Sequence, residues 1–87
     1  MIQKQLIVGL IPGLESRMAV QFVQKASSFS SNIFLMKNEK KMAAKSIIGI
    51  MVLMICRGDS VTLIADGIDE EKAVTVLSGI LINEFDE

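Results

Sequence analysis

A serine followed by an apolar run is the feature of this sequence with the clearest chemical meaning. Ser46 follows a lysine and directly precedes an apolar run of ten residues, Ile47 to Cys56. A serine at this position predicts a helix N-cap, whose hydroxyl accepts a hydrogen bond from a backbone N–H of the first turn. The same N–H groups and the helix dipole favour an anion, so a phosphate on Ser46 would be stabilised there. The alternative is a cap with no further role.

The residues around Ser46 define what else this stretch can do. Lys40, Lys41 and Lys45 are expected to place positive charge near Ser46. The apolar run is too short to cross a bilayer, which needs about 20 residues. Cys56 is the only cysteine, lies within the run and cannot form an internal disulfide. We therefore expect a buried structural thiol in a protein of a reducing compartment.

Length and composition limit the classes of protein that this chain can belong to. Its 87 residues predict one domain, residues 1–87, and 51% hydrophobic against 22% charged residues argues against disorder. A net charge of −1 gives no indication of direct nucleic-acid or membrane binding. A chain with no histidine and one cysteine cannot assemble a conventional zinc site, and nothing indicates another cofactor. The first residues read as a strand and not as a signal peptide, which predicts a cytoplasmic protein.

Hydrophobic periodicity predicts the order of the elements. We expect strands over residues 2–8, 32–37, 40–43 and 60–66, and helices over residues 16–27, 47–53 and 70–84. This β-α-β-β-α-β-α order predicts an α+β domain with a four-stranded antiparallel sheet and its helices on one face.

Two local details of this prediction concern the ends of elements. The turn Asn38-Glu39 joins two strands, and asparagine suits the positive φ of a tight hairpin whereas glutamate does not, so a longer or strained turn is expected. Asp69 is expected to cap the final helix, whose first turn carries acidic residues of the sign that the dipole favours.

Three motifs together resemble the HPr family, the small phosphocarriers of the bacterial sugar phosphotransferase system. They are Gly13-Leu14-x-x-Arg17, Lys45-Ser46-Ile47-x-Gly49-x-Met51-x-Leu53 and Gly67-x-Asp69-Glu70. The resemblance covers the whole chain in length and element order. It implies the family's fold, an open-faced β-sandwich with three helices on one face of the sheet.

The sequence departs from this family at the carrier site. The phosphoryl-accepting histidine of HPr proteins would fall at position 15, where this chain has Glu15, and Met18 stands where the family usually has proline. A carboxylate repels an incoming phosphate, whereas the family's site is built around an imidazole. Glu15 and Arg17 are therefore expected to mark an inactive carrier site.

An HPr-like chain that lacks the histidine and keeps the serine motif is similar to the Crh-like members of the family. This resemblance implies that Ser46 is phosphorylated by HPr kinase/phosphorylase, and that the protein then acts as corepressor of the catabolite control protein, a LacI-type transcription factor. It implies partner contacts at Lys45, Ile47, Ile48 and Met51. It also implies a regulatory protein that is not an enzyme.

Other interpretations stay open at this point. The chain could be a phosphocarrier acting through Glu15, since carboxylates are phosphorylated in some enzymes, or a folded paralogue that has lost its partners. Arg17 could be a solvated side chain, and Met51 and Met54 could fill the core. The resemblance further implies a homodimer formed by exchange of the first strand, with Pro12-Gly13 as the hinge.

Overall fold

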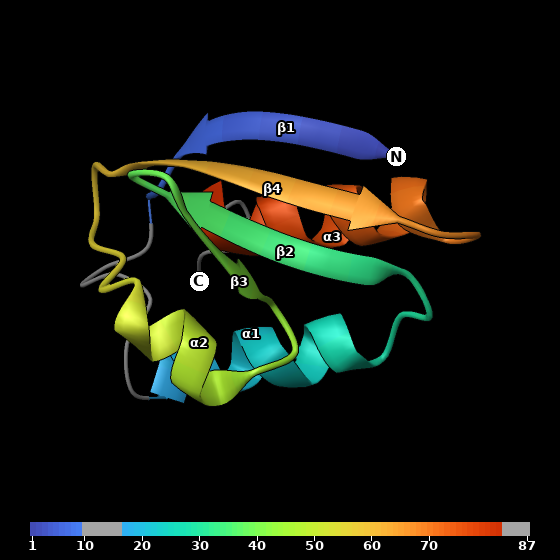
Figure 1. Ribbon diagram of the computed structural model, residues 1–87, viewed down its shortest axis with the longest axis horizontal. Helices are drawn as coiled ribbons and strands as arrows, with labels where there is room; N and C mark the ends of the chain where they lie inside the picture. The colour runs from blue at the N-terminus through green and yellow to red at the C-terminus, as the bar shows by residue number, and fades with distance from the viewer. Residues whose placement is uncertain (10–16, 83–87) are drawn as a thin grey trace.

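The computed structural model describes residues 1–9 and 17–82 (Figure 1). The elements within these residues are β1 (Ile2–Ile7), α1 (Arg17–Ser27), β2 (Asn32–Lys37), β3 (Lys40–Ala43), α2 (Ile47–Val52), β4 (Ser60–Asp66) and α3 (Glu70–Ile82). None of the described helices has the length and apolar character that crossing a bilayer requires.

The strands form one four-stranded sheet in the order β1-β4-β2-β3, and every neighbouring pair is antiparallel. Figure 1 shows α3 behind β4 and β2, and α1 and α2 next to each other below β2 and β3. The predicted α+β fold with helices on one face of an antiparallel sheet is therefore confirmed.

The core lies between the sheet and the two longer helices. The central strand β4 buries Val61, Leu63 and Ala65 on its helix side. Facing them are Phe22 of α1 and Leu77 of α3, both fully buried. Side chains of this size each contribute about 1.5–3 kcal/mol when they leave water. These contacts fix the two helices on the sheet and leave α2 at the margin of the core.

The predicted bounds agree with the structure to within one residue wherever the structure describes them. β2, β3 and β4 have their predicted bounds, while β1 ends one residue early. α2 ends at Val52, one residue inside the prediction, and α1 is described from Arg17 onward, because its predicted first residue, residue 16, lies outside the described residues. The predicted last turn of the third helix, residues 83–84, lies outside the described residues, as do Pro12-Gly13 and Glu15.

The prediction of a buried thiol at Cys56 is wrong, because this side chain is exposed. The apolar run does not continue as one helix: α2 ends with Leu53 as its C-cap, and Met54 has φ of 51°. Beyond that point the chain is irregular, so Ile55 enters the core, being 2% exposed, and Cys56 turns outward. Met51 and Met54 do not fill the core either; they are 50% and 73% exposed.

The turn between β2 and β3 is tight and strained. Lys37 pairs with Lys40, so only Asn38 and Glu39 lie in the loop, with φ of 51° and 70°. Positive φ at both loop residues is typical of a type I′ turn, which matches the twist of the strands. The expected strain is therefore present at Glu39, whose side chain disfavours this region.

Candidate phosphorylation and docking site

Ser46 has the geometry of an N-cap. Its backbone is extended, with φ of −109° and ψ of 115°, and its hydroxyl accepts a hydrogen bond from the Gly49 N–H at 3.1 Å. Its own N–H donates to the Ala43 carbonyl at 3.1 Å, at the end of β3. The residue is exposed. The structure thus confirms the predicted cap, on an exposed residue whose backbone is held by these hydrogen bonds.

Gly49 allows this cap to lie close to the sheet. A Cβ at this position would lie 3.2 Å from the Cβ of Met42 and 3.3 Å from the Oγ of Ser46. Both distances are tighter than ordinary van der Waals contact, so a larger residue would displace either β3 or the serine hydroxyl. The glycine therefore holds the start of α2 against β3 without covering the hydroxyl.

The three lysines that were expected near Ser46 each contact another group. The Lys45 ammonium donates to the Phe29 carbonyl at 2.8 Å and so links the start of α2 to the loop after α1. The Lys41 ammonium lies 4.6 Å from the centre of the Phe34 ring. Lys40 lines a hollow at the other end of α2. Stabilisation of an anion at Ser46 would thus come first from the helix N–H groups.

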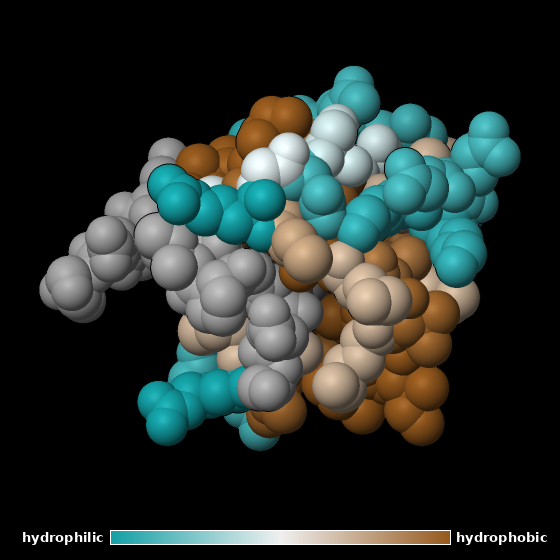
Figure 2. Space-filling model, turned by 90° about the vertical axis from the view of Figure 1, so that its left-hand side faces the viewer, coloured by the Kyte–Doolittle hydropathy of each residue, from teal (hydrophilic) through white to brown (hydrophobic). Residues whose placement is uncertain are grey.

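An apolar surface begins next to Ser46. We call it the α2 patch and define it as Ile48, Met51, Val52 and Met54, which are 73%, 50%, 47% and 73% exposed. Figure 2 shows apolar surface gathered on the side of the molecule where α2 ends. Contiguous apolar groups at a surface indicate an interaction site more strongly than single ones do.

The predicted contact residues divide between this patch and the core. Ile48 and Met51 belong to the α2 patch, whereas Ile47 is half-buried and packs against the core. The sequence interpretation missed Val52 and Met54. A signal was available, because Ile48, Met51 and Met54 recur at a spacing of three residues, and a short marginal helix buries only one side.

The predicted carrier site is only partly described. Arg17 is the first residue of α1 and is exposed, which fits a side chain in contact with solvent. Glu15 lies outside the described residues. A carrier site formed by Glu15 and Arg17 together therefore stays a prediction.

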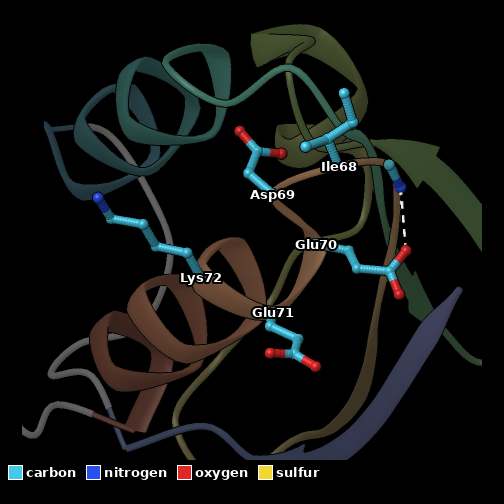
Figure 3. Close-up of a pocket in the computed structure, with 6 residues that line it drawn as sticks. Ile68, Asp69, Glu70, Glu71 and Lys72 are labelled. Atoms are coloured by element: carbon cyan, nitrogen blue, oxygen red, sulfur yellow. Dashed lines mark hydrogen bonds between the residues drawn. The ribbon is translucent and has the colours of Figure 1, made fainter.

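A second hollow lies at the corner between β4 and α3, remote in sequence from Ser46 (Figure 3). It has a volume of about 410 Å³ and is lined by residues 67–72. The Glu70 carboxylate turns back and accepts a hydrogen bond from the Gly67 N–H at 3.0 Å, drawn as a dashed line. It also lies 3.3 Å from the N-terminal amine of Met1. No group of acidic, histidine or cysteine side chains among the described residues could hold a metal ion.

Asp69 does not act as the simple helix cap that was expected. Its carboxylate accepts hydrogen bonds from the backbone N–H groups of Ser30 and Ser31, at 2.9 and 3.0 Å, and from both serine hydroxyls. These donors, the Ser31 hydroxyl first, lower the pKa of Asp69 from its ordinary 3.8 to about 2. The residue therefore ties the loop after α1 to the start of α3.

The lowered pKa of Asp69 predicts an acid dependence of stability. Its contribution is complete above the ordinary pKa of 3.8 and is lost as the pH falls through about 2. Urea midpoints should therefore fall more steeply between these two pH values for the wild type than for Asp69→Asn. The matched variant Glu71→Gln removes a neighbouring exposed carboxylate and should follow the wild type. Parallel curves for Asp69→Asn and the wild type would contradict this role.

Comparison with known proteins identifies the family. The sequence model described as PTS HPr component phosphorylation site matches residues 2–83. The chain belongs to the HPr family. It is 45% identical to HPr-like protein Crh of Bacillus subtilis over 84 residues, which are 97% of this chain and 99% of that protein. The HPr family consists of phosphocarrier and regulatory proteins and not of enzymes.

Solved HPr-family structures have the same fold. A crystal structure of HPr-C-His from Thermoanaerobacter tengcongensis matches with a TM-score of 0.93 at 42% identity, covering 100% of this chain and 98% of that one. The crystal structure of Bacillus subtilis Crh, described as a domain-swapped dimer, gives a TM-score of 0.77 at 45% identity, with 97% of each chain covered. In the present structure β1 pairs with β4 of the same chain.

Proposed function

We propose that this HPr-family chain is a Crh-like regulator of carbon catabolite repression. In this proposal HPr kinase/phosphorylase phosphorylates Ser46, and the phosphorylated protein acts as corepressor of the catabolite control protein. The observation that carries the proposal is an exposed serine cap beside the exposed α2 patch, in a sequence without histidine. The sequence similarity to Crh over nearly the whole chain supports it.

The local geometry suits a switch that changes charge and not shape. A phosphate on Ser46 would add about −1.5 to −2 charges at pH 7 next to the first N–H groups of α2. One of those groups, the Gly49 N–H, already donates to the serine oxygen. The phosphate should therefore leave α2 folded and present a new anion beside the α2 patch. A basic pocket on the partner would bind the anion, and the patch would supply the desolvated contact.

The remaining parts of the proposal concern the context of the protein. Residues 1–87 act as one HPr-like domain in the cytoplasm, and the repressor, not this chain, contacts DNA. By analogy with Crh, whose crystal structure is a domain-swapped dimer, the chain also forms a homodimer by exchange of β1. Light scattering on the purified protein tests this: a monomer at every concentration would exclude the exchange.

The switch is tested by incubation with HPr kinase/phosphorylase and ATP, followed by intact-mass and peptide analysis. One phosphate on Ser46 is expected, because this residue is exposed and its capped backbone lies beside the α2 patch. Phosphate on another serine, or none, would remove the basis of the proposal.

The same proposal predicts that Glu15 is a poor phosphoryl acceptor. With the first enzyme of the phosphotransferase system and phosphoenolpyruvate, the wild type should take up no transferable label, because a carboxylate repels the incoming phosphoryl group. Glu15→His should restore acceptance only partly, since Met18 also departs from the family pattern. Label on the wild type that disappears in Glu15→Gln would favour the alternative, a phosphocarrier with an altered site.

A further inference from the structure

The sulfur-bearing residues of the run from Ile47 to Cys56 all lie at the surface. The large side chains that the run buries are hydrocarbons, namely Ile50, Leu53 and Ile55. The side chains that carry sulfur are exposed, namely Met51, Met54 and Cys56. Methionine in a core fills irregular gaps, and neither of these two methionines lies in the core. Core packing therefore does not explain why sulfur stands at these positions.

The two methionines extend from one turn of backbone that the fold holds in place. The Met54 N–H donates to the Met51 carbonyl at 3.1 Å, and the Lys37 ammonium donates to the Met54 carbonyl at 2.6 Å. The φ of Met54 is 51°, a region that is unfavourable for a residue with a side chain. An exposed methionine gains little on folding that would offset this strain. Residues with such a backbone conformation cluster at functional sites.

The other methionines of the chain provide an internal comparison. Met18 and Met42 are half-buried and pack against the core, and Met36 is half-buried in β2. Met1 is 69% exposed, but its amine lies 3.3 Å from the Glu70 carboxylate, at the corner between β4 and α3. Exposed sulfur is oxidised more readily than buried sulfur. The fold therefore places two readily oxidised thioethers in the α2 patch, and a third at a distant corner.

A hydroperoxide converts such a thioether into a sulfoxide. An electron pair of the methionine sulfur attacks one peroxide oxygen, so that an S–O bond forms while the O–O bond breaks. The proton of the transferred hydroxyl passes to the leaving oxygen, which departs as water or, from an organic hydroperoxide, as an alcohol. The sulfur is oxidised and the peroxide is reduced. The flexible apolar side chain becomes a polar one, and methionine sulfoxide reductases reverse the change.

We propose that Met51 and Met54 form a modification site for hydroperoxides, and that their sulfoxides prevent the partner from docking on the α2 patch. This inference rests on the proposed function for the role of the patch and adds its regulation. In the free protein water solvates the sulfoxide oxygen, and a desolvated contact would remove that water without replacing its hydrogen bonds. Ser46 stays available to the kinase, because its hydrogen bond with the Gly49 N–H involves neither methionine.

The order of oxidation is measured on the full-length protein, with hydrogen peroxide as the probe. Peptide mass analysis over time should find sulfoxide at the three exposed methionines before it appears at Met18, Met36 and Met42. The Tm should stay within about 3 °C of the untreated value while only the exposed methionines are oxidised, since none of them lies in the core. Earlier oxidation of the half-buried methionines, or unfolding at this stage, overturns the proposal.

The effect on docking is measured with protein phosphorylated on Ser46, titrated with the repressor before and after peroxide treatment. The Kd should rise at least about tenfold, because unpaired polar oxygens would have to be desolvated. The matched control is the double variant Met51→Leu/Met54→Leu, which keeps apolar side chains and retains Met1. Treatment should leave its Kd at its own untreated value. An unchanged Kd in the wild type, or an equal rise in the double variant, overturns the proposal.

Two further measurements exclude other oxidative damage. Cys56→Ser removes the exposed thiol, which lies outside the α2 patch, and peroxide should raise its Kd as it does for the wild type. Methionine sulfoxide reductases of both stereospecificities, with dithiothreitol as reductant, should restore the original Kd. Resistance of Cys56→Ser to peroxide, or a raised Kd after both sulfoxides have been removed, would assign the loss to another group and overturn the proposal.

Failure of this inference is distinguishable from failure of the proposed function. If the repressor binds oxidised and untreated protein equally well, the switch at Ser46 stands and the modification site does not. If untreated phosphorylated protein does not bind the repressor, the proposed function fails, and retention on a hydrophobic-interaction column tests the patch instead. Oxidation should then shorten the retention of the wild type more than that of Met51→Leu/Met54→Leu. Equal changes in retention would overturn the inference as well.

Discussion

Ser46→Ala should fold normally and never bind the catabolite control protein. Loss of an N-cap typically destabilises a protein by about 1 kcal/mol, and here one hydrogen bond, from the Gly49 N–H, is lost. Binding is expected to disappear because the variant cannot present an anion beside the α2 patch. The measurement is titration of the repressor with wild type and variant, each after treatment with the kinase and ATP, together with urea unfolding of both.

The control for this experiment is Thr75→Ala, which removes an exposed hydroxyl from α3. It should match the wild type in phosphorylation and in repressor binding. If the untreated wild type binds the repressor as tightly as the phosphorylated form, the switch is contradicted although the fold stands.

The strands and the longer helices were predictable because their signals are local. Phe22 and Ala26 recur with Ala19 on one side of α1, and all three are buried. The predicted bounds of β4 hold because β-branched and apolar residues run between two turns, and the strand is central in the sheet. Periodicity of this kind arises because one face of an element is buried, so it can be recognised in the sequence without knowledge of the tertiary structure.

The apolar run after Ser46 shows where local signals end. Sequence alone predicted a helix over residues 47–53, which holds to within one residue, and a buried Cys56, which is wrong because the backbone turns left-handed at Met54. The cause is a tertiary one: Lys37 of β2 holds the Met54 carbonyl, and Asp59 holds both Lys37 and the Cys56 N–H. The residues of the run contain no pattern from which the contacts with Lys37 and Asp59 could be predicted.

The candidate site was predictable to a similar extent. The cap at Ser46 followed from residue type and position, and the structure has it. The direction of the lysines did not follow, because Lys45 pairs with a carbonyl, that of Phe29, sixteen positions away in the sequence. The direction of a long side chain depends on its tertiary partners, and the sequence alone does not show where those partners lie.

Met51→Asp should separate phosphorylation from docking. Met51 is 50% exposed in α2, so the fold should lose little beyond an unfavourable interaction of about 0.3–1 kcal/mol between an acidic residue and the C-terminal end of the helix. The kinase should still phosphorylate Ser46, since the serine cap and its backbone are unchanged. Binding of the repressor should weaken by about 2 kcal/mol or more, roughly thirtyfold, because a charge would have to be desolvated at the centre of the apolar contact.

Two variants make the Met51 result specific. Met51→Leu keeps the apolar volume and should bind within about threefold of the wild type, since such exchanges are well tolerated. Ile68→Asp places the same charge on an exposed apolar position at the distant corner between β4 and α3, and should bind as the wild type does. Titration calorimetry of the four phosphorylated proteins with the repressor gives the comparison. Equal affinity of Met51→Asp and wild type would show that the phosphate alone carries recognition and that the α2 patch has another purpose.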